Sequence, residues 1–134
     1  MRPFPLKIVT PDGLSFDGQA ESVTLRTAVG EVGILAGHMD FVTTLGMGRC
    51  KIVTEGKERI AACIGGMVSV SKGSVNVVAT TFEWAEDIDA KRAEASADRA
   101  KATLSNKEAS DADLRLAQAR LKRALVRSSV AKPM

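Results

Sequence analysis

Apolar and polar residues alternate over short stretches in the first 84 residues of the chain. Residues 22–26, Ser-Val-Thr-Leu-Arg, have an apolar side chain at every second position, which is the period of a half-buried β-strand. Further apolar runs follow at 59–70 and 75–78, and the polar turn signals Glu-Gly-Lys at 55–57 and Ser-Lys-Gly at 71–73 separate them. Short strands with turns about every 8–12 residues are typical of an antiparallel sandwich or barrel.

Two adjacent glycines, Gly65 and Gly66, interrupt the apolar run at 59–70. Glycine weakens a strand interior, so it is found there mainly where the strand bulges or where another segment of backbone comes close. The pair therefore predicts a bulge or a close backbone approach within this strand.

The pattern changes after Trp84. Residues 85–131 contain neither Gly nor Pro, and they are rich in alanine, which is strongly helix-forming composition. Asp87 is placed to cap a first helix that starts at Ile88, with Asp89 in its first turn. We expect this helix to run to about Leu104.

A second helix is expected after a break at residues 105–109. The residues from Ser110 to Asp113 resemble a capping box with Asp in place of the usual Glu, and the helix should run to about Arg127. Two helices with a short link should form an antiparallel hairpin. The predicted organisation is a β-sandwich domain at 1–84 followed by a helical hairpin domain at 85–134.

The apolar face of the first helix is shallow, because it consists mostly of alanine methyl groups. Each buried methylene contributes only about 0.8 kcal/mol. One interpretation is a hairpin that docks weakly on the sandwich and can leave it. The other is that small residues simply allow close packing between helices. The sequence of this face supports both interpretations equally. The face consists of Ile88, Ala93, Ala97, Ala100 and Leu104.

The charges of the two predicted helices are sorted by sign. Six acidic residues outnumber two basic ones at 82–98, and six basic residues, Lys132 among them, outnumber two acidic ones at 111–132. In an antiparallel hairpin these regions are neighbours, and both suit the helix dipoles. The simplest interpretation is that complementary charge holds the hairpin together.

Two further interpretations of these charges stay open. Asp89 and Arg92 should fall opposite Arg123 and Arg127, and converging guanidinium groups suit phosphate oxygens, so a polyphosphate pocket without a Gly-rich loop could form here. Alternatively, the second helix presents a basic strip to an acidic partner surface. That strip would consist of Arg115, Lys122 and Arg123.

The remaining residue types argue against catalysis and metal binding. The chain has one His and two Cys, and no Walker, nucleophile-elbow or metalloprotease motif occurs. Cys50 and Cys63 lie in strand-like surroundings, so we expect reduced, partly buried thiols and no metal site. The net charge of +3 is too small to indicate nucleic-acid binding. Neither a signal peptide nor a run of about 18 apolar residues is present, so a cytosolic chain without direct membrane insertion is expected.

Five segments in order resemble the epsilon subunit family of bacterial F-type ATP synthases. The most specific is Gly-Glu-Val-Gly-Ile-Leu-Ala-Gly-His at 30–38, and another is Ile-Asp-Ala-Lys-Arg-Ala at 88–93. The others are Ile-Val-Thr-Pro-Asp-Gly at 8–13, Ala-Glu-Ser-Val at 20–23 and Gly-Gly-Met-Val at 65–68. Their order and spacing agree with the family across nearly the whole chain.

This resemblance implies a fold of about ten antiparallel β-strands followed by a helix-turn-helix. It also implies a non-catalytic rotor subunit that couples ion-driven rotation of the c-ring to ATP synthesis through the gamma subunit. Glu31 would lie near the c-ring, while His38 and Thr43 would face gamma. The subunit would be peripheral to the cytoplasmic face of the inner membrane, within the F1 sector. Extended helices would reach the alpha and beta subunits and inhibit ATP hydrolysis.

The resemblance further implies a regulatory nucleotide site, although no cofactor is required. In some members the folded hairpin binds ATP through the motif at 88–93, so the protein could instead act as an ATP sensor. The corresponding ATP-binding residues here would be Glu83, Ile88, Asp89, Arg92, Ala93, Arg99, Arg123 and Arg127.

The chain departs from the family at Ala36, where Pro is common, and at residues 39–41.

Overall fold

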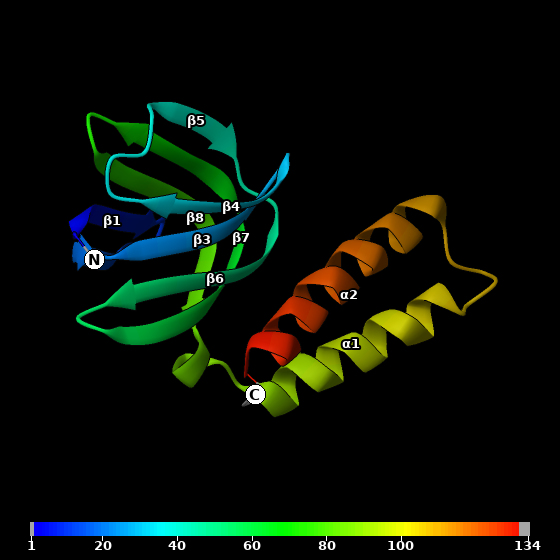
Figure 1. Cartoon of the computed structure of the whole chain (residues 1–134). Helices are drawn as coiled ribbons and strands as arrows, with labels where there is room; N and C mark the ends of the chain where they lie inside the picture. Colours follow the sequence, from blue (N-terminus) through cyan, green and yellow to red (C-terminus); the bar gives the residue numbers. More distant parts are fainter. Residues whose placement is uncertain (1, 132–134) are drawn as a thin grey trace. The chain divides into compact units, whose positions relative to one another are not determined.

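A computed structural model describes residues 2–131 (Figure 1). The chain divides into two compact units, Met1–Trp84 and Ala85–Met134. Lys132 and the end of the predicted hairpin domain at residue 134 lie outside the described residues. The strands are β1 (Phe4–Thr10), β2 (Gly13–Ala20), β3 (Ser22–Thr27), β4 (Gly30–Leu35), β5 (Phe41–Thr44), β6 (Met47–Thr54), β7 (Lys57–Ser71) and β8 (Ser74–Trp84). The helices are the 3-10 helix η1 (Ala85–Asp87) and the α-helices α1 (Ala90–Leu104) and α2 (Asp111–Ala131).

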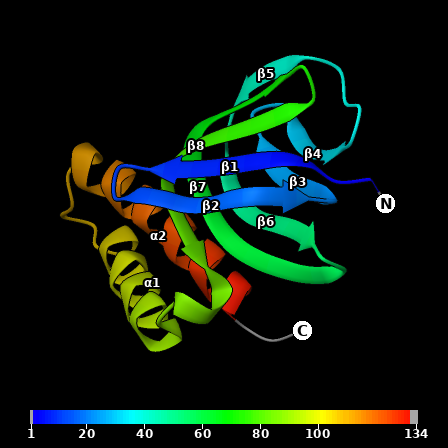
Figure 2. The ribbon, with the colours of Figure 1, turned by 90° about the vertical axis from the view of Figure 1, so that its left-hand side faces the viewer.

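The strands of the first unit form a β-sandwich by folding one sheet around a common core (Figure 2). The strand order is β2-β1-β8-β7-β6-β3-β4, and β5 pairs with β7 away from this path. Hydrogen bonds tie the β2–β3 corner to the end of β6. The backbone N–H of Glu21 donates to the Val53 carbonyl at 2.7 Å, and the Thr54 hydroxyl donates to the Gln19 carbonyl at 2.8 Å.

The expected number and direction of strands need correction. The described residues form eight strands rather than about ten, and β1 runs parallel to β8 from Leu6 to Val9. The number is smaller because β7 is continuous through its glycine pair. It pairs with β6 up to Ile64 and with β5 from Met67 onward. One long strand thus takes the place of two of the short strands that were expected. The sandwich architecture itself is confirmed.

Gly65 and Gly66 allow β7 to change partners at this point. Their φ angles are +71° and +116°, conformations that side chains strongly disfavour. A Cβ atom on Gly66 would overlap the carbonyl oxygen of Val78 and lie 2.8 Å from the Cα of Ala79. The predicted close backbone approach is therefore present, and β8 is the approaching strand.

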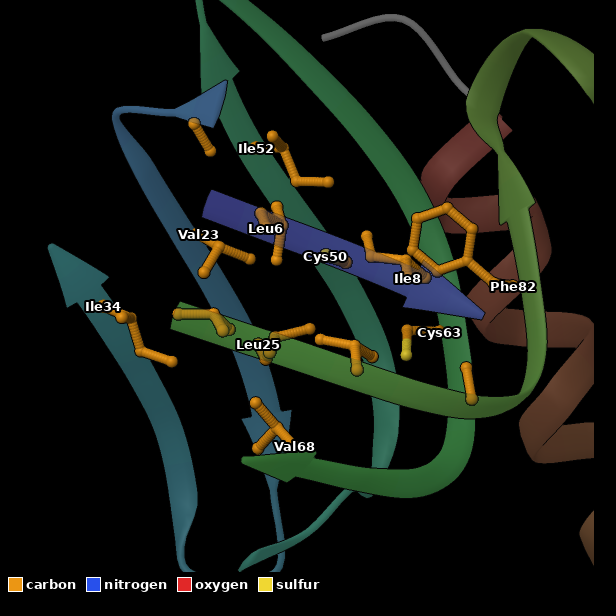
Figure 3. Packing of buried hydrophobic residues seen from close by; sticks show 14 of the residues in the cluster. Leu6, Ile8, Val23, Leu25, Ile34, Cys50, Ile52, Cys63, Val68 and Phe82 are labelled. Atoms are coloured by element: carbon orange, nitrogen blue, oxygen red, sulfur yellow. The ribbon is translucent and has the colours of Figure 1, made fainter. Parts of the chain in front are cut away.

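The core of this unit is built from the inward side chains of alternating strand positions. Figure 3 shows aliphatic residues from β1, β3, β4, β6 and β7 pointing toward one another. Burying each Val, Leu or Ile side chain contributes about 1.5–3 kcal/mol. The labelled members of this cluster are Leu6, Ile8, Val23, Leu25, Ile34, Cys50, Ile52, Cys63, Val68 and Phe82.

The second unit is a hairpin of α1 and α2, as predicted. The expected cap of the first helix was wrong, because Asp89 rather than Asp87 is the N-cap of α1. Its Oδ1 accepts a hydrogen bond of 3.0 Å from the backbone N–H of Arg92, and Asp87 lies in η1. The predicted capping box is present. The Asp113 N–H donates to the Ser110 hydroxyl oxygen at 3.1 Å, and the Ser110 N–H donates to an Asp113 carboxylate oxygen at 3.4 Å.

Alanine methyl groups form the contact between the two helices. Ala93, Ala97 and Ala100 are buried on α1, and Ala117 and Ala124 are buried on α2. Small side chains at this spacing let helix backbones approach closely. Among the helices of the described residues, none is long and apolar enough to span a membrane.

Candidate functional site

An apolar row crosses the outer face of four adjacent strands in the sandwich. Met67 on β7 pairs with Val78 on β8, which in turn pairs with Val9 on β1. Val42 lies on the same face of β5, opposite Ser69 and therefore two register positions along from Met67. The side chains of Val42, Met67 and Val78 are 61%, 48% and 60% exposed. Contiguous apolar side chains at this exposure are typical of a protein–protein contact.

A shallow cavity of about 580 Å³ lies along this apolar row. Its walls combine the row with small residues of β7 and β8, so a partner could insert an apolar side chain there. The lining residues are Val9, Thr10, Pro11, Gly66, Met67, Ser69, Asn76, Val78, Ala79 and Thr80.

His38 and Thr43, the residues expected to face gamma, lie next to β5 and on it. The Nδ1 of His38 is 2.8 Å from the Met39 carbonyl oxygen, and since a carbonyl only accepts, this nitrogen carries the proton. The His38 ring stands edge-on to Phe41 at 5.8 Å. Thr43 shares a strand face with Phe41, which packs against the core. It therefore points away from the apolar row.

Sequence reasoning missed Val42, Met67 and Val78 as candidate contact residues. Each strand displays its own alternation, but only the pairing of β5, β7 and β8 shows that the three side chains form one row. The one signal in the sequence was an apolar residue directly after the glycine pair, at Met67.

Glu31 lies at the opposite strand edge, on β4, in register with Arg26 of β3. A groove of about 430 Å³ opens beside this pair, and three basic side chains and one carboxylate contribute to its walls. The lining residues are Thr24, Arg26, Glu31, Met47, Gly48, Arg49 and Lys51.

Most of the basic residues proposed for nucleotide binding lie on one side of the helical hairpin. Arg92 and Arg99 are seven positions apart on α1, and Arg127 on α2 is seven positions from Arg120, an arginine outside the predicted set. That spacing places each pair on one face of its helix. Arg123 belongs to the same stripe of α2.

A cleft of about 510 Å³ between the two stripes contains Arg99 and Arg120. Arg120 was not among the predicted ligand residues, although its spacing of three from Arg123 could have suggested it. The cleft is lined by Ser96, Arg99, Ala100, Thr103, Asp113, Leu116, Ala117 and Arg120. Its size falls within the usual range for small-molecule sites, about 300–1,000 Å³.

The other predicted ligand residues have different surroundings. Ala93 is buried against α2, while Ile88 lies between η1 and α1. Asp89 already uses one carboxylate oxygen to cap α1. Glu83 belongs to β8 of the first unit. Within the second unit, the structure thus brings together the arginines of the two stripes, but not all of the residues predicted to bind ATP.

The predicted basic strip of α2 is divided between two faces. Arg115 and Lys122 are seven positions apart and share an exposed face. Arg123 follows Lys122 directly, so it lies about 100° around the helix. Arg123 is half-buried and belongs to the stripe beside the cleft, so the strip consists of Arg115 and Lys122.

The two thiols are buried in the core of the sandwich and lie diagonally across the β6–β7 pair. Burial raises the pKa of the Cys63 thiol from 9.0 to about 12. Burial, followed by the charge of Cys63, raises the pKa of Cys50 still further. Thiols that stay protonated are poor nucleophiles. No cluster of His, Cys, Asp or Glu able to hold a metal ion was found in residues 2–131.

Comparison with known families matches both units. Residues 3–85 match the family described as ATP synthase, Delta/Epsilon chain, beta-sandwich domain. Residues 86–132 match its counterpart described as ATP synthase, Delta/Epsilon chain, long alpha-helix domain.

Individual relatives align over nearly the full length. The ATP synthase epsilon chain of Ruminococcus albus is 41% identical over 132 residues, covering 98% of both chains. That of Bacillus velezensis is 39% identical over 131 residues, also covering 98% of both chains.

Two solved structures share the fold at low sequence identity. A chain of the mitochondrial ATP synthase OSCP/F1/c-ring assembly of Euglena gracilis has a TM-score of 0.86 and 22% identity, covering 97% of this chain and 82% of that one. A chain of the central stalk/c-ring of the Tetrahymena thermophila enzyme has a TM-score of 0.63 and 14% identity, covering 96% of both.

Proposed function

The chain belongs to the ATP synthase delta/epsilon family, and we propose that it is the non-catalytic epsilon subunit of an F-type ATP synthase rotor. In this role it couples ion-driven rotation of the c-ring to ATP synthesis through gamma. The observation that carries the proposal is the match of both units, in order, to the two domains of this family over residues 3–132. Relatives named ATP synthase epsilon chain align end to end with it.

The subunit works by binding its partners, and catalysis belongs to other subunits of the complex. It would be peripheral to the cytoplasmic face of the inner membrane, as part of the F1 sector. Extension of α1 and α2 toward the alpha and beta subunits would inhibit ATP hydrolysis. The division of the chain into two compact units supports this division of labour, because a separate hairpin can act without unfolding the sandwich.

The apolar row is the surface that we assign to gamma. Val42, Met67 and Val78 expose apolar area on paired strands of one sheet, so the backbone that carries them needs no ordering on binding. The neighbouring segment is also held in place, because the Lys72 N–H donates a 3.0 Å hydrogen bond to Asp40 just before β5. His38 would lie at the polar rim of this contact.

Binding of purified gamma tests this assignment. Met67→Glu or Val78→Lys would place a charge in the centre of the contact and should weaken binding at least tenfold. Val29→Asp is the matched control, since Val29 is a 77% exposed apolar residue in the β3–β4 turn, outside the apolar row. Equal affinities for all three variants and the wild type would remove the row from the gamma contact.

A second function, ATP sensing by the hairpin, is favoured by the two arginine stripes and the cleft between them. Arginine side chains converging from two helices suit a polyphosphate, and the cleft is large enough to admit part of a nucleotide. The hairpin would then bind ATP in its folded form. ATP bound there would compete with extension of the helices.

Isothermal titration of the chain with ATP separates this function from the rotor role. Arg92→Ala and Arg123→Ala should each weaken binding about tenfold, because each removes a charge-assisted hydrogen bond. Arg115→Ala should leave it unchanged, since Arg115 lies on the other face of α2. Absence of heat from the wild type, or equal affinity in all variants, would exclude a nucleotide site here.

A further inference from the structure

The groove beside Glu31 is lined by three basic side chains and one carboxylate. It lies on the outer face of β3, β4 and β6, where Arg26, Arg49 and Lys51 face a single carboxylate, that of Glu31. Lys51 also pairs with Glu58, with 3.6 Å between Nζ and Oε2. That pair is exposed on both sides, so it is weak and leaves Lys51 available to a stronger partner.

Gly48 on β6 and Gly46 just before it leave room for the stem of Arg26. A Cβ atom on Gly48 would lie 2.8 Å from the Cβ and 3.2 Å from the Cγ of Arg26, and one on Gly46 would lie 3.4 Å from the same Cγ. The φ angle of Gly48 is not among the positive ones, so its backbone does not demand glycine. The missing side chain makes room for the stem of Arg26, which lies across the strand.

This placement suits a carboxylate ligand. A guanidinium matches a carboxylate with its two-pronged donor edge, so Arg26 can hold an acidic side chain by two parallel hydrogen bonds. Lys51 adds a second cation, and Thr24 adds a hydroxyl donor. Glu31, in register with Arg26, opposes a multiply charged phosphate more strongly than a singly charged carboxylate.

We propose that this groove, centred on Arg26 and Lys51, binds an aspartate or glutamate side chain of a neighbouring protein subunit. The inference rests on the proposed assembly of the chain into an ATP synthase. Beyond that function, it specifies one contact within the assembly, in which the partner subunit supplies an acidic side chain.

Zero-length cross-linking tests the contact in the assembled complex. Complexes stripped of this subunit are reconstituted with the full chain and treated with a water-soluble carbodiimide, which joins an amine to a carboxylate as an amide. Mass spectrometry should find Lys51 linked to an acidic residue of another subunit, and Lys51→Arg should abolish that link. Lys51 linked only to Glu58 of its own chain, or not linked at all, would overturn the proposal.

Binding measurements separate the positioning of Arg26 from its charge. In the same reconstitution at about 50 mM salt, Arg26→Gln should weaken binding about tenfold, the cost of losing a charge-assisted hydrogen bond. Gly48→Ala keeps every charge but displaces the stem of Arg26, so it should weaken binding too. Lys57→Gln, at the far turn of β6 and β7, should bind like the wild type. Equal affinity for Arg26→Gln and the wild type would contradict the proposal.

Two outcomes distinguish this inference from the function on which it rests. If the wild-type chain does not bind the stripped complex, the proposed assembly itself fails. If it binds but Lys51 forms no link to another subunit, only the acidic contact fails. Binding to phosphatidylglycerol vesicles tests whether a lipid phosphate is the ligand instead. If Arg26→Gln weakens binding to the vesicles but not to the complex, the ligand is a lipid phosphate, and the proposed carboxylate contact is wrong.

Discussion

Gly66 occupies a position with no space for a side chain. Its φ angle is +116°, and the backbone of β8 at Val78 and Ala79 fills the volume where a Cβ atom would be. Gly56, in the β6–β7 turn, also has a positive φ of +73°, but nothing lies within 4 Å of its Cβ position. An alanine at position 66 would therefore meet both backbone strain and steric overlap, whereas an alanine at position 56 would meet backbone strain alone.

Gly66→Ala should destabilise the sandwich by about 3 kcal/mol or more, since the alanine combines strain with backbone overlap. Gly56→Ala should cost only about 1–2 kcal/mol, the price of a left-handed conformation. Urea unfolding of both variants measures the difference. Similar losses in the two variants would mean that β7 and β8 can move apart at Gly66 without cost.

The buried thiols predict a loss of stability at high pH. Burial raises the pKa of Cys63 from 9.0 to about 12 and that of Cys50 further. Above pH 9 the unfolded chain therefore releases protons that the folded chain retains, so the free energy of unfolding falls as pH rises. Each thiol contributes a fall of about 1.4 kcal/mol per pH unit in this range.

Urea unfolding at pH 8 and pH 10 measures this effect. Between the two values, Cys63→Ala should lose about 1.4 kcal/mol less than the wild type, because one of the two thiols is gone. Its lower stability at pH 8, from lost packing, does not affect that comparison. An equal pH dependence in both proteins would show that Cys63 titrates normally in the folded chain.

The sequence predicts the structural role of a single residue well where that role depends on the residue's own backbone conformation. The glycine pair indicated a close backbone approach, and β8 provides it. The exposed row of Val42, Met67 and Val78 could not be predicted in the same way, because three strands must be paired before their side chains become neighbours. Arg26 was missed for a related reason, since its position depends on Gly46 and Gly48, which come close to it only once β3 and β6 are paired.

At the scale of the elements, the first helix begins two residues later than predicted. Asp87 and Asp89 are both acceptable caps by residue type, and local sequence does not distinguish them. The structure does, because the residues from Ala85 to Asp87 form η1 and leave Asp89 to accept from Arg92. The capping box at Ser110 was predicted correctly, since no second set of cap residues competes with it nearby.

Substitution of the two aspartates measures the difference between them. Asp89→Ala removes the cap hydrogen bond and should destabilise α1 by about 1 kcal/mol, whereas Asp87→Ala should leave the helix nearly unchanged. Hydrogen exchange of the amides of Arg92 and Ala93 reports the stability of the first turn directly. Faster exchange in Asp87→Ala than in Asp89→Ala would mean that the helix starts at Ile88 in solution.

The strands were easier to place than to pair. Alternation located the apolar runs, and the sandwich followed from them, but the parallel pairing of β1 with β8 joins segments from opposite ends of the domain. Periodicity carries no information about such partners. The number of strands was overestimated because a continuous β7 bends at its glycines and pairs with both β5 and β6.

At the scale of the whole molecule, the two units account for the two parts of the proposed function. The sandwich carries an apolar row across β5, β7, β8 and β1 and a basic groove on β3, β4 and β6. A part that couples two partners requires two such separate surfaces. The hairpin is held together by alanine contacts, which are small and therefore inexpensive to separate. This favours a coupling role for the first unit and a regulatory role for the second.

Gradient-driven ATP synthesis by membranes stripped of this subunit tests the coupling role. Adding the full chain should restore synthesis, and adding a chain without residues 88–134 should restore it as well, because the sandwich is a compact unit of its own. In the same membranes the shortened chain should permit faster ATP hydrolysis than the full chain. Equal hydrolysis rates would remove the inhibitory role of the hairpin, and failure of both chains to restore synthesis would contradict the assignment of this protein to the rotor.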